Sequence, residues 1–370
     1  MYFSGFLRER SITMKKFISI LAAGALLATL LAGCGSNSGS SSAAVDSSAP
    51  ESSSASEPAS ESTASGTGLK FGLGLVTELS GTDATADKDG KGEAAVTAAG
   101  VLLDAEGKVL SCYIDVMDAS MPFTAEGAMN IAEGTEFASK QALGADYGMV
   151  GASGIGKEWN EQADAFAAWA VGKTAEEIAA GVGEDGKATD ADLAAGCTVG
   201  ASAFVEAMDK AIANAKDCTA SETDTVRLAM VADASSSKDA ADGKDGAAQA
   251  DVTVSAVALN AEGVVTASAL DVVEAKITFD ATGVVTSDLA APTTKQELGA
   301  DYGMVGASGI GKEWFEQADA FAAWTVGKTA DEIAAGVGED GKAVDADLAA
   351  GCTVGASAFV AAAVAAATVA

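Results

Sequence analysis

The sequence predicts an α+β protein made of two tandem copies of one domain, each with N-terminal antiparallel strands followed by helices. Residues 143–205 return as residues 298–360 with four substitutions, and residues 95–116 return more loosely as residues 251–272. Within each copy, apolar residues first alternate with period two and later recur at helical spacing. Strands followed by helices in this way are typical of α+β domains. Repeats of about 150 residues are too long for a solenoid.

The N-terminal region has the pattern of a secreted bacterial lipoprotein. Two lysines after Met14 precede a long apolar run that ends in LAGC at residues 31–34. The run predicts a secretory signal peptide, and its end resembles a lipobox. The resemblance implies cleavage before Cys34, which would then carry lipid. A transmembrane helix is the alternative, but the run is short for the roughly 20 residues that a span needs. Residues 1–13 do not belong to this pattern, which leaves Met1 and Met14 as possible starts.

Residues 35–67 are Ser-rich and acidic, with almost no large apolar side chains. Such a segment cannot bury enough surface to fold, so we expect a flexible tether after the signal peptide of residues 1–34. The first repeat domain is expected over residues 68–216, a linker over 217–224, and the second domain over 225–370. Each domain is long enough for a core of its own, so residues 68–216 are expected to fold alone.

The elements of the first copy follow in order. Strands are expected from Leu69 to Val76, over residues 96–103 and over residues 109–116. The turn DAEGK joins the last two as a hairpin. Phe123, and Phe279 in the second copy, would begin a further strand. Helices are expected over residues 157–171, after the capping box that starts at Thr174, and from about Ala201 onward.

Composition excludes several classes of function. The chain has 22 Lys+Arg against 53 Asp+Glu, a net charge of −31, and no His. Nucleic acid is therefore not an expected partner, because binding phosphates needs basic patches. Catalytic triads and metal sites that depend on His are excluded as well. The cysteines after Cys34 show neither a disulfide framework nor zinc-site spacing, although a bridge between Cys112 and Cys218 stays open; the other two are Cys197 and Cys352.

The sequence GASGIGKEW occurs twice, at residues 151–159 and 306–314. Its first seven letters fit part of the phosphate-binding pattern G-x-x-x-x-G-K-[ST]. The hydroxyl that should follow the lysine and bind magnesium is replaced by Glu158 and Glu313. No buried strand is predicted upstream, where the pattern requires one. We therefore interpret the glycines as a turn into an amphipathic helix rather than a nucleotide site.

A second repeated motif resembles a known family more specifically. Residues 192–200 read DLAAGCTVG ahead of an Ala-rich helix, and residues 347–355 repeat them. The motif looks like the C-terminal signature of bacterial FMN-binding domains. These occur in the C subunit of sodium-pumping NADH:quinone reductases and in tandem in flavin-bearing surface lipoproteins. The rest of each unit looks like repeat lipoproteins of Gram-positive anaerobes.

The resemblance implies that Thr198 and Thr353 receive FMN through a phosphoester bond made by a separate flavin transferase. A phosphate just before a helix start would face free N–H groups. The chain departs from the family at Cys197 and Cys352, where the family has Ala, and at Gly200 and Gly355, where it has a hydroxyl. The implied recognition residues are Asp192, Asp347, Gly196 and Gly351. Candidates to cover the flavin ring are Tyr147, Met149, Trp159 and Trp169.

Two classes of function therefore remain. One is a lipid-anchored electron-transfer protein on the outer face of the cell membrane, with a separate redox partner and redox chemistry that belongs to FMN. Such a carrier is not an enzyme by itself. The other is a non-catalytic surface module for binding or envelope structure, in which Thr198 is a turn residue and Cys197 a small buried hydrophobe.

Overall fold

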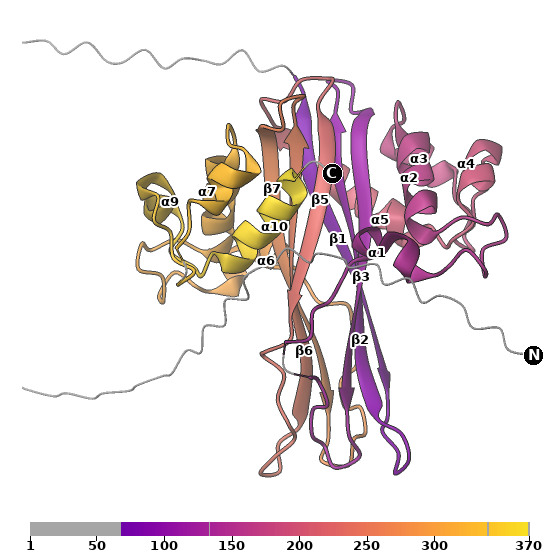
Figure 1. Ribbon diagram of the computed structural model, residues 1–370, viewed down its shortest axis with the longest axis vertical. Helices are drawn as coiled ribbons and strands as arrows, with labels where there is room; N and C mark the ends of the chain where they lie inside the picture. The colour runs from indigo at the N-terminus through magenta and orange to yellow at the C-terminus, as the bar shows by residue number, and fades with distance from the viewer. Residues whose placement is uncertain (1–67, 133, 339, 369–370) are drawn as a thin grey trace, which may run out of the picture. The chain divides into compact units, whose positions relative to one another are not determined.

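The computed structural model describes residues 68–132, 134–338 and 340–368 (Figure 1). The predicted signal peptide, Cys34 and the predicted tether lie outside these residues. In each repeat strands precede the predicted helices, and further short elements that were not predicted, among them two 3₁₀ helices, accompany them. The first repeat contains β1 (Lys70–Thr82), β2 (Gly90–Leu103), β3 (Val109–Phe123), α1 (Lys140–Leu143), η1 (Gly144–Tyr147), α2 (Trp159–Ala170), α3 (Ala175–Ala180), α4 (Ala191–Gly196), α5 (Ser202–Ala213) and β4 (Lys216–Asp217). The second contains β5 (Thr225–Asp233), β6 (Gly246–Leu259), β7 (Val265–Phe279), α6 (Lys295–Leu298), η2 (Gly299–Tyr302), α7 (Trp314–Thr325), α8 (Ala330–Ala334), α9 (Ala346–Gly351) and α10 (Ser357–Ala367).

The strands form two antiparallel sheets, ordered β3-β2-β1-β4 and β5-β6-β7. The α+β prediction is thus confirmed, with strands before helices in both repeats. The expected hairpin turn is present between β2 and β3, where Asp104 Oδ1 accepts hydrogen bonds from the backbone N–H groups of Glu106 and Lys108. The prediction for Phe123 and Phe279 was wrong. Each ends its strand instead of starting another, because β3 and β7 continue without a break for 15 residues.

The inner faces of the two sheets pack against each other and share one core. Apolar side chains of β1, β2 and β3 are buried in the same cluster as those of β5, β6 and β7. Phe123 and Phe279, which occupy equivalent positions in the two copies, stack with ring centroids 4.0 Å apart and planes 4° apart. Two equivalent side chains in direct contact indicate a pseudo-twofold axis between the sheets.

Backbone contacts near the Phe pair obey the same pseudo-symmetry. Ala84 N–H donates to Gly283 O at 2.8 Å, and the equivalent Ala240 N–H donates to Gly127 O at 2.7 Å. Side chains repeat the pattern with the same pairing of loops. The carboxylate of Asp239 accepts from Met129 N–H at 2.7 Å, and that of Asp83 accepts from Val285 N–H at 2.8 Å. Backbone N–H groups in each repeat thus donate hydrogen bonds to oxygen atoms of the other repeat.

The helices cover the outer faces of the sheets and give each repeat a second core (Figure 1). In the first repeat, α5 lies across β1 and β2. The approach is close because β1 has glycines there. A Cβ added at Gly72 would lie 2.0 Å from Ala211 O, and one at Gly74 would lie 2.3 Å from Ala207 O. The layers are therefore helices, sheet, sheet and helices, with α4 and α9 on opposite flanks.

Because the two repeats share this core, we no longer expect residues 68–216 to fold alone as a monomer. Residues 65–370 form one compact unit that contains both repeats. Separation would expose the inner apolar face of each sheet to water.

Among the described residues, no helix has the length and apolar composition needed to cross a membrane.

Replacement of Phe123 by Ala should destabilise both repeats together. Removal of a fully buried Phe costs about 3–5 kcal/mol, and this ring contacts the other repeat directly. Scanning calorimetry should show one cooperative transition, shifted to lower temperature as a whole. Val150→Ala, at a side chain that is 45% exposed, is the control and should leave the transition in place. Two transitions, of which only one shifts, would contradict the shared core.

Candidate functional site

The GASGIGK segment forms a closed turn that leads into α2, as expected. Glu158 is the N-cap of this helix, and its carboxylate accepts from Met149 N–H at 2.7 Å and Val150 N–H at 3.2 Å. Ser153 Oγ accepts from the N–H groups of Ile155 and Lys157. N–H groups that would cradle a phosphate in a nucleotide-binding loop are thus directed into the turn itself. The second copy has the same bonds around Glu313 and Ser308.

A fully buried glutamine joins this turn to the candidate attachment site. Gln162 Oε1 accepts from both Thr198 N–H, at 2.8 Å, and Thr198 Oγ1, at 3.0 Å. Its Nε2 donates to Ser153 Oγ at 3.1 Å and to Lys157 O at 3.2 Å. The two repeated motifs therefore meet in space, although 36 residues separate Gln162 from Thr198. Gln317 connects Thr353 to Ser308 in the same way.

Thr198 itself is exposed, and its hydroxyl is held in one direction by the amide of Gln162. Four residues later α5 begins, and its N-cap Ala201 offers no side-chain hydrogen bond to the first turn. A phosphate at this position would find N–H donors that no capping side chain occupies. The space beside Gly200 is open, so a hydroxyl-bearing side chain could be placed there.

The implied recognition residues have roles in folding. Asp190, not Asp192, is the N-cap of α4, and it accepts from the N–H groups of Asp192 and Leu193. These bonds hold the pKa of the Asp190 carboxyl below its usual value. Asp192 is exposed. Gly196 faces α2 so closely that an added Cβ would lie 2.8 Å from the Cβ of Ala165.

The second repeat agrees with the first. Asp345 is the N-cap of α9, and Asp347 only donates its N–H to the Asp345 carboxylate. A Cβ added at Gly351 would lie 2.8 Å from the Cβ of Ala320. Gly196 and Gly351 are therefore explained by helix packing, and they are not evidence for a cofactor.

The aromatic residues that we expected to cover a flavin ring belong mainly to the core. Trp159 is 4% exposed and makes an edge-to-face contact with Phe204, at 5.7 Å between ring centroids. Trp169 packs against Phe166. Tyr147 and Met149 lie at the margin of the same cluster. Thr198 is thus an exposed residue that a covalently held group could reach, whereas an aromatic cover for a flavin ring does not come from these residues.

No disulfide joins any two of the four cysteines in the described ranges. Cys197 and Cys352 are buried in the cores beneath the helices, consistent with small apolar side chains. The possible bridge between Cys112 and Cys218 is not formed. Cys112 donates its S–H to Ala167 O at 3.4 Å, and burial raises its pKa to about 12. No cluster of three or more acidic or sulfur ligands in the described ranges has the geometry to hold a metal ion.

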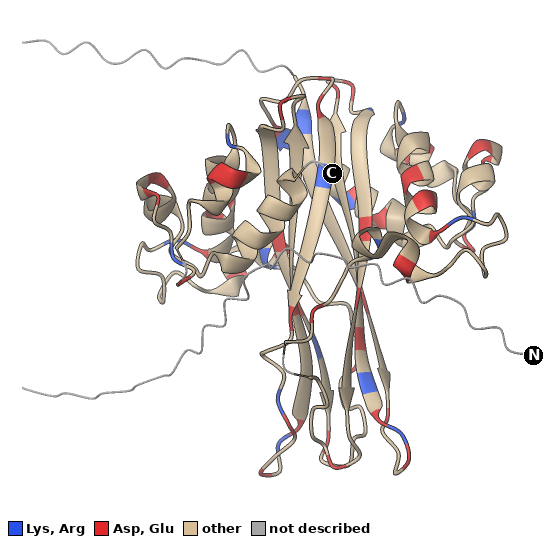
Figure 2. Cartoon of the chain, viewed as in Figure 1, with Lys and Arg blue, Asp and Glu red and all other residues tan. Residues whose placement is uncertain are grey.

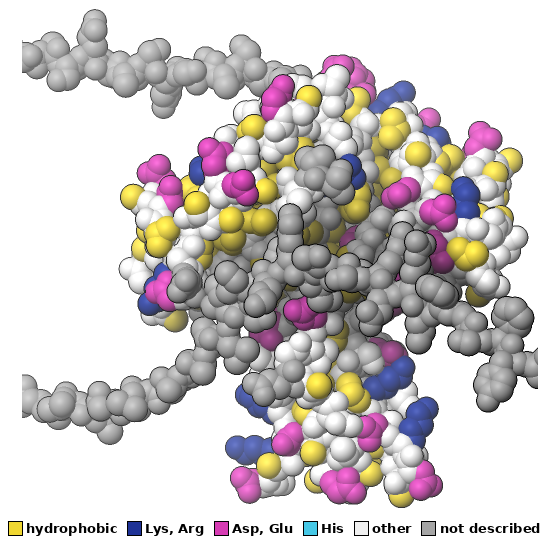
Figure 3. Space-filling view, in the orientation of Figure 1, with side chains coloured by type: hydrophobic (Ala, Val, Ile, Leu, Met, Phe, Trp, Pro, Cys, Tyr) yellow, Lys and Arg dark blue, Asp and Glu magenta, His cyan; other side chains and the backbone are white. Residues whose placement is uncertain are grey.

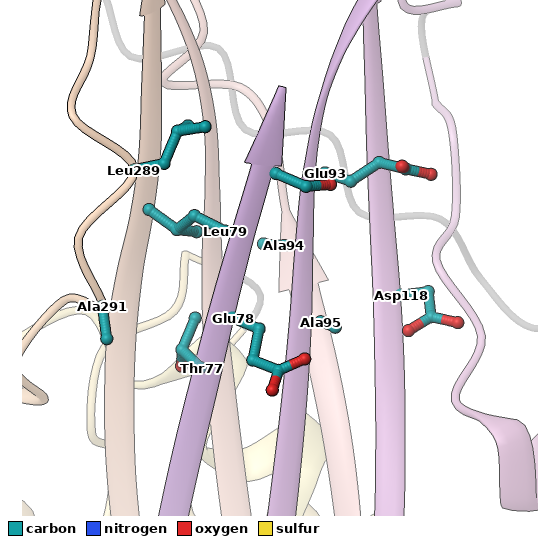
Figure 4. A pocket seen from close by; sticks show the side chains of 10 residues that line it. Thr77, Glu78, Leu79, Glu93, Ala94, Ala95, Asp118, Leu289 and Ala291 are labelled. Atoms are coloured by element: carbon teal, nitrogen blue, oxygen red, sulfur yellow. The ribbon is translucent and has the colours of Figure 1, made fainter. Parts of the chain in front are cut away.

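A cavity of about 620 Å³ lies beside β1, away from Thr198 and Thr353 (Figure 4). The carboxylates of Glu78, Glu93 and Asp118 line it from three neighbouring strands, with Leu79 and Leu289 on the opposite side of β1. Two of the carboxylates are already paired. Glu93 contacts Lys91 at 2.7 Å, and Asp118 contacts Lys140 at 3.0 Å. The cavity is therefore a solvated acidic recess. Elsewhere on the face in view, acidic side chains are scattered among basic and apolar ones (Figures 2 and 3).

Comparison with known proteins found no match. No family model, no curated protein and no solved structure is significantly similar to this chain.

Sequence reasoning did not identify Gln162, and it also missed two buried carboxylates. Asp115 on β3 is 2% exposed, and Asp271 on β7 is 7% exposed. Asp115 Oδ1 accepts from Val116 N–H at 2.7 Å and from Gln141 N–H at 3.0 Å. Burial outweighs these hydrogen bonds and raises the pKa of both carboxyls to about 6. The sequence signal that could have identified both carboxylates is a polar residue within a strand that is otherwise buried.

The Asp115→Asn variant should reveal this raised pKa as a pH-dependent difference in stability. An unfolded Asp titrates near pH 4, so between about pH 4 and 6 the folded protein binds more protons than the unfolded chain. The contribution of Asp115 to stability is therefore highest at pH 4 and falls as the pH rises. Wild-type stability minus variant stability should drop by roughly 2–3 kcal/mol from pH 4 to pH 7.

Urea unfolding at several pH values measures this difference. The control is Val150→Ala, which removes no titratable group at a side chain that is 45% exposed, so its difference from wild type should be nearly constant over the same range. A constant difference for Asp115→Asn as well, or one that grows toward neutral pH, would show that its pKa is not raised.

Proposed function

We propose that this chain is a lipid-anchored protein on the outer face of a Gram-positive cell membrane, and that it carries FMN on Thr198 and Thr353 for electron transfer. The anchor rests on the lipobox-like LAGC and on the Ser-rich segment after it. The cofactor rests on the repeated motif and on one structural observation. In both repeats, the threonine is an exposed residue whose hydroxyl is oriented by a fully buried glutamine.

In this proposal, each feature close to the modified threonine has a defined role. Gln162 fixes the rotamer of Thr198, so that its oxygen is presented to a flavin transferase in one direction. The uncapped start of α5 stabilises the negative phosphate, an effect of about 0.3–1 kcal/mol at an exposed helix end. Bound FMN would supply the electron transfer. The helices α4 and α9, which end shortly before Thr198 and Thr353 in the sequence, lie on opposite flanks of the sheets (Figure 1).

The alternative is a non-catalytic surface module for binding or envelope structure. One specific observation favours it: Trp159, proposed as ring cover, is committed to the core. In that case Thr198 and Gln162 serve to hold two loops together, and no cofactor is attached. The mass of the protein distinguishes the two functions.

The anchor is tested by Cys34→Ala. Without the lipidated cysteine, the protein should move from the membrane fraction to the soluble fraction, because no other element among the described residues could span the bilayer. Fractionation with immunoblotting measures this distribution. Ser36→Ala is the control and should remain membrane-bound. A Cys34→Ala protein that stays in the membrane would disprove lipid anchoring.

The cofactor is tested by intact mass after co-expression with an active flavin transferase. The wild type should carry up to two FMN groups, Thr198→Ala and Thr353→Ala up to one each, and the double variant none. Gly200→Ser and Gly355→Ser should raise occupancy if the transferase recognises a hydroxyl there, and the open space beside Gly200 and Gly355 accepts the side chain. Unmodified mass in both the wild type and the Ser variants would leave the non-catalytic module as the function.

A further inference from the structure

A second cavity, of about 700 Å³, lies between the two repeats. Its walls come from β1, the end of α5 and β4 on one side, and from β7, α6 and α7 on the other. The volume is in the range of small-molecule sites. None of its lining residues belongs to the Thr198 or Thr353 motifs, so this cavity is independent of the proposed flavin function.

One wall of the cavity is a preformed polar frame. Gln296 donates from Nε2 to Asp319 Oδ1 at 3.1 Å and to Leu270 O at 3.1 Å. Its backbone N–H donates to the buried carboxyl of Asp271 at 3.0 Å. The hydroxyl of Ser268 is buried there too and has no hydrogen-bond partner among the described residues.

The pseudo-twofold axis relates this frame to an equivalent one in the first repeat. There, Gln141 donates to Asp164 Oδ1 at 3.0 Å and to Ile114 O at 3.2 Å, and its N–H donates to Asp115. The two frames are thus nearly identical in geometry. What lies in front of them differs, because Tyr113 of the first repeat is replaced by Ala269 in the second.

In the first repeat, the space in front of the frame contains an aromatic ring and a cation. The guanidinium of Arg227 lies 5.8 Å from the centroid of the Tyr113 ring. Both aspartates of that frame, as well as Arg227, lie close enough to influence the pKa of Tyr113. In the second repeat, Ala269 provides no ring, and the equivalent of Arg227 on β1 is Gly72. The volume of a ring and a cation is therefore missing on that side.

The charge of the cavity also favours a cation. Four acidic residues line it, against one lysine, and one of the four, Glu297, is already paired at 2.8 Å with Lys210 outside the lining. Lys216 pairs with Asp319 at 3.0 Å, but its side chain is 74% exposed, so the pair is weak and Lys216 is easily displaced. The acidic residues are Asp217, Asp271, Glu297 and Asp319. Phe71, Leu73 and Leu270 supply apolar surface for a flat ring.

We propose that this cavity binds a small organic cation that carries a planar ring, such as an aryl amidine, guanidine or amine. The ring lies beside Ala269, where Tyr113 lies in the other repeat. The cationic group lies near Asp319, in place of the Lys216 ammonium. The first repeat thus contains, as its own side chains, the kind of group that the second repeat takes from solution.

Benzamidinium is the probe, titrated into the full chain by calorimetry or NMR. Saturable binding of one molecule per chain is expected, with a dissociation constant of about 1 mM or lower for a ligand of this size. Benzoate has the same ring with a negative charge, and benzyl alcohol has no charge. Both should bind at least tenfold more weakly.

Variants assign the binding to this cavity. Ala269→Tyr restores the ring of the first repeat and should remove detectable binding, and Asp319→Asn should weaken it about tenfold. Asp164→Asn, the equivalent change in the filled repeat, is the matched control and should leave binding unchanged. Lys216→Ala should strengthen binding, because it removes the competing cation. Thermal unfolding of each variant shows whether it is folded.

A gain-of-function variant keeps the proposal falsifiable if Ala269→Tyr fails to fold. The double change Tyr113→Ala and Arg227→Gly should open a second site and raise the stoichiometry from one to two. The proposal is overturned if benzamidinium does not bind in a saturable way, if benzoate binds equally well, or if the folded Ala269→Tyr protein retains the affinity.

Discussion

Contact between the inner faces of the two sheets is the constraint on which the rest of the structure depends. Each sheet has one apolar face for its own helices and another that only the opposite repeat can cover. Small residues bring the central strands β2 and β6 together. A Cβ added at Gly100 would lie 3.0 Å from that of Ala256, its pseudo-symmetry equivalent. The hydrophobic effect therefore makes two sequence repeats into one folded unit.

The same contact explains why the helical halves of the two repeats are nearly identical in sequence, whereas their strand halves are not. Residues 143–205 and 298–360 differ at four positions, whereas residues 90–123 and 246–279 agree at only 14 of 34. The nearly identical segments 143–205 and 298–360 form the helices on separate flanks of the sheets, so identical sequences are compatible there. Around the axis, equivalent positions meet, and complementary pairs such as Gly100 with Ala256 fit where two larger identical residues would collide. Divergence there also produced the difference between Tyr113 and Ala269.

Local signals in the sequence predicted much of the fold and little of the candidate site. The turn DAEGK and the capping box at Thr174 depend on nearby residues, and both were found where expected. The end of β3 at Phe123 was misjudged because its partner, Phe279, is 156 positions away and only the fold brings them together. Gln162 was missed for the same reason. It occupies a core position of an amphipathic helix, and its bonds to Thr198 and Ser153 depend on tertiary structure.

Sedimentation of the isolated first repeat, residues 68–217, tests the shared core most directly. The repeat carries one half of a pseudo-twofold interface, and two copies can bring their Phe123 rings together as Phe123 and Phe279 do in the full chain. We predict a reversible dimer that unfolds cooperatively and loses its cooperative transition as dilution produces monomers. A stable monomer with a cooperative transition that does not depend on concentration would contradict the account.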